Sequence, residues 1–198
     1  QLIWFHAASV GEVQSIFPLI KKLNNEKKKL EFLITTVTLS GGNIVKKKFI
    51  GYKNIKHRYF PLDINFIMKS FLNKWKPNLV IFIDSEIWPN LIFEIKKRKI
   101  PIALINGRIT KKSFNKWMLM SNFAKKIFSS FDLCLASSKE SEKNLRVLAV
   151  KNLKNFGNIK FSGEIEKKDL VDKNLEILKK KTFWCAASTH KGEENICL

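Results

Sequence analysis

The sequence predicts an α/β fold in which helices cover both faces of a parallel, doubly wound β-sheet. Short apolar runs alternate with lysine-rich amphipathic stretches along the 198 residues. This alternation is typical of parallel strands joined by crossover helices. Hydrophobic residues make up 45% of the chain, which is enough for a packed core. No apolar run approaches the roughly 18 residues that a membrane span needs.

Each predicted strand is a short apolar run, and the predicted helices are the amphipathic stretches between these runs. In the first helix, apolar residues follow the spacing of one buried stripe, at Val13, Ile16, Phe17, Ile20 and Leu23. In chain order, the predicted strands are Leu2–His6, Glu31–Thr36, His57–Phe60, Leu79–Ile83, Pro101–Ile105, Leu133–Ala136, Leu153–Phe156 and Phe183–Ala187. The predicted helices are Gly11–Asn24, Gly41–Phe49, Ile64–Trp75, Trp88–Lys97, Phe114–Phe128, Glu140–Leu148 and Lys168–Lys181.

A domain boundary is predicted near Ser162–Lys168, where Asn158–Phe161, predicted as a strand or loop, gives way to a charged segment. We therefore expect a first domain over residues 1–163. Residues 164–198 would form a linker and the start of a second domain. Both ends look truncated, because Gln1 directly precedes a strand-like run and Leu198 lies inside a predicted helix.

The formal net charge is +20, and Lys supplies nearly all of the excess. Proteins that recognise a nucleic-acid sequence usually use Arg for bidentate contacts to bases and phosphates. This chain has only four Arg residues: Arg58, Arg98, Arg108 and Arg146. One interpretation is a solvated lysine surface that reflects an AT-rich coding bias. The other is a polyanionic partner, for which an anionic membrane surface or a phosphorylated lipid is at least as plausible as nucleic acid. The three Cys residues form no CxxC pair, so neither a disulfide framework nor a zinc site is expected.

In an open parallel sheet, ligands bind outside the carboxyl ends of the strands, so the loops that follow the strands are the candidate sites. The first loop contains Ser9, Gly11 and Glu12, where small residues allow a ligand to approach the backbone closely. Glu12 lies at the opening turn of a helix. It could act as a general base at the crevice, or it could serve the helix N-terminus electrostatically.

The second loop places two carboxylates, Asp84 and Glu86, after the most apolar strand. Charges at the rim of a core need hydrogen bonds or a substrate to hold them. A structural role is also open, because Pro89 suits a first helical turn that Ser85 or Glu86 could cap.

Three further loops carry polar or basic residues. Asn106 and Arg108 follow the next strand, where the Arg could clamp a carboxylate or a phosphate. Lys160 lies where the first domain stops. The last loop is suited to hydrogen-bonding an anion and contains Ser188, Thr189, His190 and Glu193. No P-loop, GxGxxG, HExxH or GxSxG motif occurs, which argues against the enzyme classes that these motifs mark.

Taken in order, the loops resemble the motif series of the 3-deoxy-D-manno-octulosonic acid (Kdo) transferases, the lipid IVA Kdo transferase family. The match spans nearly the whole chain at compatible spacing, which makes it far more specific than any one motif. The matching segments are His6–Glu12, Thr35–Thr38 with Ser40-Gly41, Pro61–Asp63, Asp84–Asn90, Asn106–Arg108, Gly157–Phe161 and Ala187–Glu193.

The resemblance implies a GT-B glycosyltransferase with two Rossmann-like domains that face a cleft, and this chain would hold the N-terminal, acceptor-binding half. It implies transfer of Kdo from CMP-Kdo to the lipid A precursor during lipopolysaccharide synthesis, without a metal or other cofactor. It also implies a site at the cytoplasmic face of the bacterial inner membrane, with an anchor that this chain lacks. Nucleic acid is not expected as a partner, and the fragment alone is expected to be inactive.

The resemblance also implies roles for three residues. Glu12 matches the proton acceptor of the family, and Asp84 and Lys160 match its transition-state-stabilising positions. The family usually has Glu where this chain has Asp84, so the side chain is one methylene shorter. Gly107 stands where Ala is usual. The main CMP-binding motifs would lie beyond Leu198.

Other functions are compatible with the same residues. One is a different GT-B glycosyltransferase with another nucleotide-sugar donor and acceptor. Another is a lysine-rich domain without enzymatic activity that binds RNA or acidic partners. The last is an inactive, degenerate fragment.

Overall fold

The structure is a computed structural model that describes residues 1–27 and 29–162. The chain divides into two units, Gln1–Gly163 and Glu164–Leu198, and all the described residues belong to the first unit. Four predictions lie outside the described residues: the last predicted strand, the helix Lys168–Lys181, the loop Ser188–Glu193 and the helix that contains Leu198.

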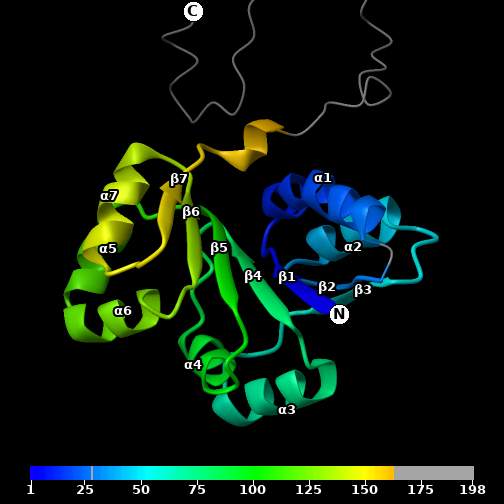
Figure 1. Cartoon of the computed structure of the whole chain (residues 1–198), viewed down its shortest axis with the longest axis horizontal. Helices are drawn as coiled ribbons and strands as arrows, with labels where there is room; N and C mark the ends of the chain where they lie inside the picture. The colour runs from blue at the N-terminus through cyan, green and yellow to red at the C-terminus, as the bar shows by residue number, and fades with distance from the viewer. Residues whose placement is uncertain (28, 163–198) are drawn as a thin grey trace, which may run out of the picture. The chain divides into compact units, whose positions relative to one another are not determined.

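The described residues form a seven-stranded, fully parallel sheet, which confirms the predicted doubly wound α/β fold (Figure 1). The strand order is β3-β2-β1-β4-β5-β6-β7, so the direction of winding reverses between β1 and β4. Such a reversal is the topological switch point at which open α/β sheets bind ligands. The strands are β1 Leu2–His6, β2 Glu31–Thr36, β3 Ile55–Tyr59, β4 Leu79–Ile83, β5 Ile102–Gly107, β6 Leu133–Ala136 and β7 Leu153–Asn155.

Helices cover both faces of the sheet. The first two pack with one apolar cluster, and α3, α4, α6 and α7 contribute to the other. In chain order they are α1 Val10–Glu26, α2 Leu39–Lys48, α3 Asn65–Trp75, α4 Pro89–Lys97, α5 Lys111–Met118, α6 Ser121–Phe128 and α7 Lys139–Val147, followed by a short 3₁₀ helix, η1, at Ile159–Ser162.

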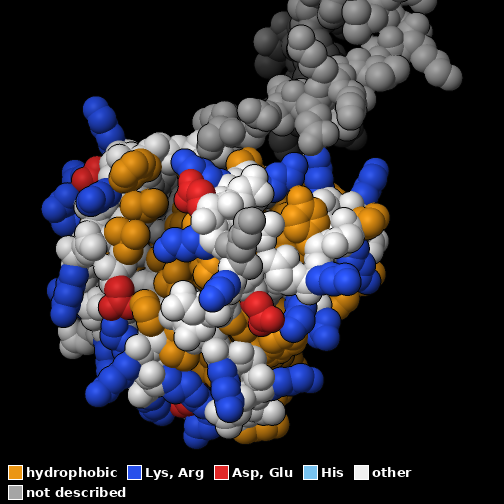
Figure 2. All heavy atoms as spheres, turned by 45° about the vertical axis from the view of Figure 1, so that its right-hand side comes forward, with side chains coloured by type: hydrophobic (Ala, Val, Ile, Leu, Met, Phe, Trp, Pro, Cys, Tyr) orange, Lys and Arg blue, Asp and Glu red, His pale blue; other side chains and the backbone are white. Residues whose placement is uncertain are grey.

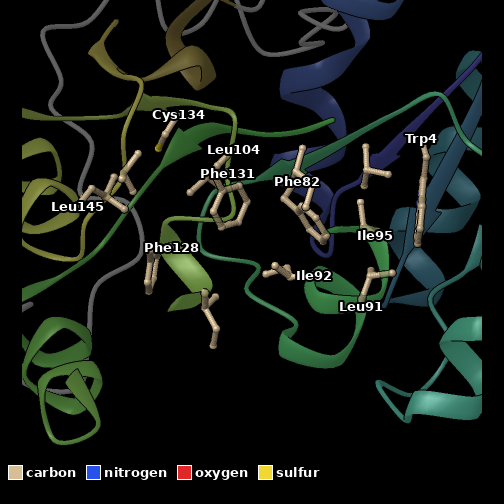
Figure 3. Close-up of a cluster of buried hydrophobic side chains, with 14 of the residues drawn as sticks. Trp4, Phe82, Leu91, Ile92, Ile95, Leu104, Phe128, Phe131, Cys134 and Leu145 are labelled. Carbon is tan, nitrogen blue, oxygen red and sulfur yellow. The ribbon is translucent and has the colours of Figure 1, made fainter. Parts of the chain in front are cut away.

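The period-two alternation of the strands divides the core between the two faces. On β1, Trp4 belongs to the cluster under α3 and α4 (Figure 3), whereas Phe5 belongs to the cluster under α1 and α2. On β4, Phe82 and Ile83 separate in the same way. The interior strands β1 and β4 are buried on both faces and read as continuous apolar runs, which is why they could be located well from the sequence. The edge strand β3 is mostly exposed and begins at Ile55, two residues before the predicted start.

The predicted helix Phe114–Phe128 is wrong as a single element, because it forms two helices, α5 and α6, that meet at Leu119 and Met120. Its apolar stripe is regular across the break except at Ser121. The two halves pack differently: Ile127 and Phe128 in α6 are fully buried, while the apolar residues of α5 are only partly buried. Packing against the sheet therefore sets the break, and no Gly or Pro marks it.

Segment Asn158–Phe161, predicted as a strand or loop, contains most of η1 instead. Asn158 starts this turn, because its Oδ1 accepts a hydrogen bond of 3.0 Å from the backbone N–H of Lys160. An Asn side chain that bonds to the backbone two residues later competes with strand pairing and favours a turn.

The predicted cap of α4 is also wrong. Pro89 does open the helix, but neither Ser85 nor Glu86 caps it. Asp63 caps it from a distant loop: its carboxylate accepts hydrogen bonds from the backbone N–H groups of Asn90 (3.0 Å) and Leu91 (2.8 Å). A negative side chain at this end also complements the helix dipole.

Lys and Arg side chains are spread over the face seen in Figure 2, with exposed apolar side chains between them and few acidic ones. Within residues 1–27 and 29–162, no helix is both long and apolar enough to cross a bilayer.

We expect Asp63→Ala to lower the free energy of unfolding by about 0.5–2 kcal/mol, the usual cost of losing a helix cap. Urea denaturation followed by circular dichroism measures the change. Ser85→Ala is the matched control and should leave the transition unchanged, because Ser85 makes no capping bond. Equal destabilisation by both variants would contradict the assignment of the cap to Asp63.

Candidate functional site

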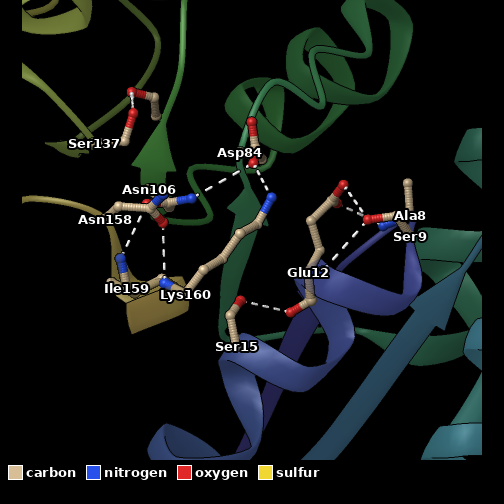
Figure 4. Close-up of polar contacts among 11 residues, drawn as sticks. Ala8, Ser9, Glu12, Ser15, Asp84, Asn106, Ser137, Asn158, Ile159 and Lys160 are labelled. Carbon is tan, nitrogen blue, oxygen red and sulfur yellow. Dashed lines mark hydrogen bonds and ion pairs between the residues drawn. The ribbon is translucent and has the colours of Figure 1, made fainter. Parts of the chain in front are cut away.

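The candidate site lies at the carboxyl ends of β1, β4 and β5, which are neighbours in the sheet. Glu12 lies in the first turn of α1, just after the loop that follows β1, Asp84 directly follows β4, and Asn106 is the second-last residue of β5. Lys160 reaches the same place from η1, far along the chain (Figure 4). The first three strand-end loops singled out from the sequence and the Lys160 segment therefore meet at one edge, beside the switch point of the sheet.

Glu12 is held by the loop that precedes α1. Ser9 is the N-cap of the helix, and its Oγ donates a 2.7 Å hydrogen bond to Glu12 Oε1. The backbone N–H of Ala8 donates to Glu12 Oε2 at 2.8 Å. This arrangement is close to a capping box, so the structural role considered for Glu12 is present. It also fixes the carboxylate in one orientation at the strand end.

The environment of Glu12 favours proton acceptance as well. Only 8% of the residue is exposed, and burial is the main cause that raises the pKa of its carboxyl group above the ordinary value. The hydrogen bonds from Ser9 and Ala8 oppose this rise, while the nearby charges of Glu86 and Asp84 add to it. A carboxylate with a raised pKa at a ligand-binding edge is what a general base requires.

Asp84 follows β4 with a left-handed backbone, at φ 63°, and is 5% exposed. Its Oδ2 accepts a 2.7 Å hydrogen bond from Lys160 Nζ, which forms an ion pair. The Lys160 side chain is 34% exposed. A buried carboxylate therefore pairs with an ammonium group that solvent or a ligand can still reach.

Asn106 follows the same pattern on β5, with φ 59° and 1% exposure. Its Nδ2 lies 3.5 Å from Asp84 Oδ2. Its Oδ1 accepts a 3.2 Å hydrogen bond from the backbone N–H of Ile159. Asn106 thus links the end of β4 to the start of η1.

Glu86 belongs to a separate network that the sequence did not reveal. Trp88 Nε1 donates to Glu86 Oε2 at 2.9 Å and lies 3.1 Å from His6 Nε2. His6 is fully buried, and its Nδ1 lies 2.9 Å from Thr35 Oγ1. His6 Nε2 also lies 3.4 Å from Glu86 Oε2, so His6, Glu86 and Trp88 form one polar cluster. In the sequence His6 stands out only as part of a motif, since no local signal shows that it meets Trp88.

A polar cavity of about 410 Å³ adjoins Asp84 and Lys160. Arg108 is exposed at this cavity, and the helices α5 and α7 begin there with their N-caps Thr110 and Ser138. The lining residues are Asp84, Arg108, Ile109, Thr110, Ser137, Ser138, Glu140, Ser141, Asn158 and Lys160. Cations and helix N-termini favour an anionic ligand here, which fits the expected role of Arg108.

Ser9 and Gly11, the other predicted site residues of the first loop, have different surroundings. Ser9 is occupied by Glu12, whereas Gly11 faces open space, because a Cβ added there would meet nothing within 4 Å. Ser188, Thr189, His190 and Glu193 lie outside the described residues. Among residues 1–27 and 29–162, no group of three or more His, Cys, Asp and Glu side chains is arranged to hold a metal ion.

Comparison with known proteins gives one consistent family. Residues 1–163 match the family model described as 3-deoxy-D-manno-octulosonic-acid transferase (kdotransferase). A 3-deoxy-D-manno-octulosonic acid transferase of Rickettsia bellii is 36% identical over 200 residues, which cover 100% of this chain and 47% of that protein. The enzyme of the same name from Haemophilus influenzae is 33% identical, with coverage of 100% and 47%. The chain therefore spans less than half the length of these relatives.

Solved structures share the fold. A putative UDP-N-acetylglucosamine 2-epimerase from Listeria monocytogenes matches with a TM-score of 0.64 and 12% identity, over 90% of this chain and 51% of that one. An Anabaena protein in complex with UDP and glucose matches with a TM-score of 0.54 and 11% identity, over 79% and 44%. At these identities the likeness shows the fold alone.

We expect the raised pKa of Glu12 to make stability depend on pH. A group that binds its proton more tightly in the folded state stabilises that state at low pH, and this contribution is lost as pH rises through the folded-state pKa. From the ordinary value of 4.5 upward, the wild type should therefore lose stability relative to Glu12→Gln. Urea denaturation of both proteins across this pH window measures the difference, and a constant difference would contradict the raised pKa.

Proposed function

The chain belongs to the 3-deoxy-D-manno-octulosonic acid (Kdo) transferase family, and on this premise we propose that it forms the acceptor-side half of a Kdo glycosyltransferase. The donor is CMP-Kdo and the acceptor is the lipid A precursor, lipid IVA. The single observation that carries the proposal is the position of Glu12, a buried carboxylate with a raised pKa at the switch point of the sheet.

In the proposed reaction, a hydroxyl group of the acceptor attacks the anomeric carbon of Kdo as the CMP phosphate leaves. Glu12 accepts the hydroxyl proton. Ser9 and the backbone N–H of Ala8 hold its two carboxylate oxygens, so the base needs little reorganisation when the acceptor arrives.

Lys160 and Asp84 supply electrostatic stabilisation. The transition state has oxocarbenium character at Kdo and negative charge on the leaving phosphate. The ammonium of Lys160 offsets the negative charge of the donor, and Asp84 keeps that ammonium in place through the 2.7 Å contact. These roles need no metal ion, and we propose a cofactor-independent transfer.

The loops beside this centre supply the remaining polar groups. Arg108 lines the polar cavity next to Lys160 and is placed to bind a phosphate or carboxylate of a substrate. Glu86 is oriented by Trp88 and remains 20% exposed, so it is suited to accept a hydrogen bond from a sugar hydroxyl. The loop Ser188–Glu193 is proposed to meet the donor.

We also propose that the protein works at an anionic membrane surface, on the cytoplasmic face of the inner membrane. The corner between α5 and α6 is suited to this contact, because Leu119 is 86% and Met120 62% exposed. No acidic residue occurs between Gly107 and Phe131. That stretch contains the cations Arg108, Lys111, Lys112, Lys116, Lys125 and Lys126. Apolar side chains surrounded by cations match the chemistry of an anionic lipid interface.

We expect Glu12→Gln in the complete gene product to reduce the rate of Kdo transfer by at least about 100-fold, the usual contribution of a general base. Mass spectrometry of a lipid IVA acceptor, with CMP-Kdo generated in situ, measures the product. Glu31→Gln is the control and should retain activity, because Glu31 is exposed at the amino end of β2, away from the carboxyl ends of the strands.

A folded wild-type protein that adds no Kdo mass would reject the donor or the acceptor. Offering UDP-sugars in the same assay would then test another nucleotide-sugar donor. Salt-sensitive RNA binding that survives Glu12→Gln would instead favour the binding domain without enzymatic activity.

For the membrane contact, we expect Leu119→Asp with Met120→Asp to weaken co-sedimentation with phosphatidylglycerol vesicles at least about tenfold, since each apolar side chain that leaves water contributes roughly 1.5–3 kcal/mol. Ile50→Asp is the matched control, because Ile50 is 77% exposed and follows α2, on the other face of the sheet. Charge reversal of Lys21, Lys22 and Lys46–Lys48 tests that face as well. Equal loss in both sets would assign the binding to general surface charge.

A further inference from the structure

Two residues near the carboxyl ends of the neighbouring strands β4 and β5 share an unusual backbone conformation. Asp84 and Asn106 both have positive φ, at 63° and 59°, and each directly follows a residue of the register pair Ile83↔Ile105. Residues other than Gly rarely adopt positive φ, and among these Asp and Asn tolerate it best. The two conformations turn the carboxylate and the amide toward each other at the strand ends (Figure 4).

The orientation of the Asn106 amide follows from its partners. The backbone N–H of Ile159 can only donate, so the atom that faces it is the amide oxygen, at 3.2 Å. The amide nitrogen then faces the Asp84 carboxylate, which accepts at the longer distance of 3.5 Å. With 1% of Asn106 exposed, both ends of its amide are engaged inside the protein. This favours a role through neighbouring residues over contact with a ligand.

The neighbour that matters is Lys160, the residue after Ile159. Its own backbone N–H donates to Asn158 Oδ1 at 3.0 Å, so two consecutive N–H groups of η1 are bound by Asn side chains. A lysine side chain has many rotamers, and ordering it costs entropy. Because the backbone at Lys160 is fixed, fewer conformations are lost when Nζ forms its ion pair with Asp84.

We propose that Asn106 is a positioning residue that anchors η1 to the sheet and so delivers the Lys160 ammonium to Asp84. This deepens the proposed function and rests on it in one respect: the positioned ammonium is the group proposed to stabilise the transition state. The anchor joins residues separated by 53 positions in the sequence, so local turn formation alone does not supply it.

Acylation of Lys160 with an N-hydroxysuccinimide ester of acetic acid tests the proposal in the complete gene product, with peptide mass spectrometry as the readout. Asn106→Gly removes the amide and keeps the backbone conformation, because Gly adopts positive φ without strain. We expect Lys160 to react about fivefold faster, the change that corresponds to the loss of one net hydrogen bond. Exposed Lys154 is the internal reference and should react at its original rate.

Asn106→Asp should change the acylation rate of Lys160 in the opposite direction. It keeps an acceptor for Ile159 and places a second carboxylate beside that of Asp84, because the replaced amide nitrogen lies 3.5 Å from Asp84 Oδ2. Two adjacent carboxylates bind the charged ammonium more strongly than one, so Lys160 should react more slowly than in the wild type. Two variants that shift one rate in opposite directions separate positioning from general loosening of the fold, which would accelerate labelling in both.

Asn54→Ala is the control, because Asn54 also bridges two segments, through Asn24 (2.6 Å) and the carbonyl of Leu30 (2.8 Å), but at the amino ends of β2 and β3. It should destabilise the protein without changing the Lys160 rate. In the transfer assay, Asn106→Gly should lower kcat with little change in KM for the acceptor.

An unchanged Lys160 rate in folded Asn106→Gly, or faster labelling in both variants, would overturn the proposal. The labelling rates test the positioning role, and the transfer assay tests the proposed function independently. The predicted labelling shifts together with a wild type that transfers no Kdo would retain the positioning role and reject the reaction. Kdo transfer by the wild type, with an unchanged Lys160 labelling rate in the variants, would support the reaction and reject the positioning role.

Discussion

The candidate site depends on the parallel pairing of β1 with β4, at the point where the strand order of the sheet reverses. Because β4 follows a crossover from β3, at the edge of the sheet, α1 leaves toward one face and α4 toward the other. The loops at the two strand ends therefore separate instead of packing against each other. Glu12 comes from one side of the opening and Asp84 from the other, and no change to either loop alone would create this arrangement.

Within that opening, two buried carboxylates are compensated in different ways. Among the residues that the structure describes, Asp84 is paired with an ammonium group, whereas the donors to the Glu12 carboxylate, Ser9 and Ala8, are neutral. Burial dominates for Glu12 and raises its pKa, and the neighbouring carboxylates act in the same direction. This difference in compensation supports the different roles that we propose for the two groups. A carboxylate without a countercharge is the better proton acceptor, and a carboxylate bound to lysine is the better electrostatic anchor.

The sequence predicted the strands best where burial on both faces leaves an unbroken apolar run, and β1, β2, β4 and β6 begin and end at the predicted residues. It located Glu12 at a helix start because that signal is local. The break between α5 and α6, the cap from Asp63 and the partners of His6 are set by packing between distant segments, which periodicity does not encode. The Asp84–Lys160 pair joins residues 76 positions apart, and only the resemblance to a family placed both in one site.

The shorter carboxylate at position 84 is understandable once its partner is considered. Where the family resemblance leads us to expect Glu, this chain has Asp, which reaches one methylene less far from the strand end. The deficit can be met from the other side if the backbone that carries the lysine is held close. Here Asn106 and Asn158 bind consecutive N–H groups of η1, and Lys160 Nζ arrives at 2.7 Å from the carboxylate. The position of η1 therefore compensates for the shorter acidic side chain. An ion pair of this geometry does not require Glu.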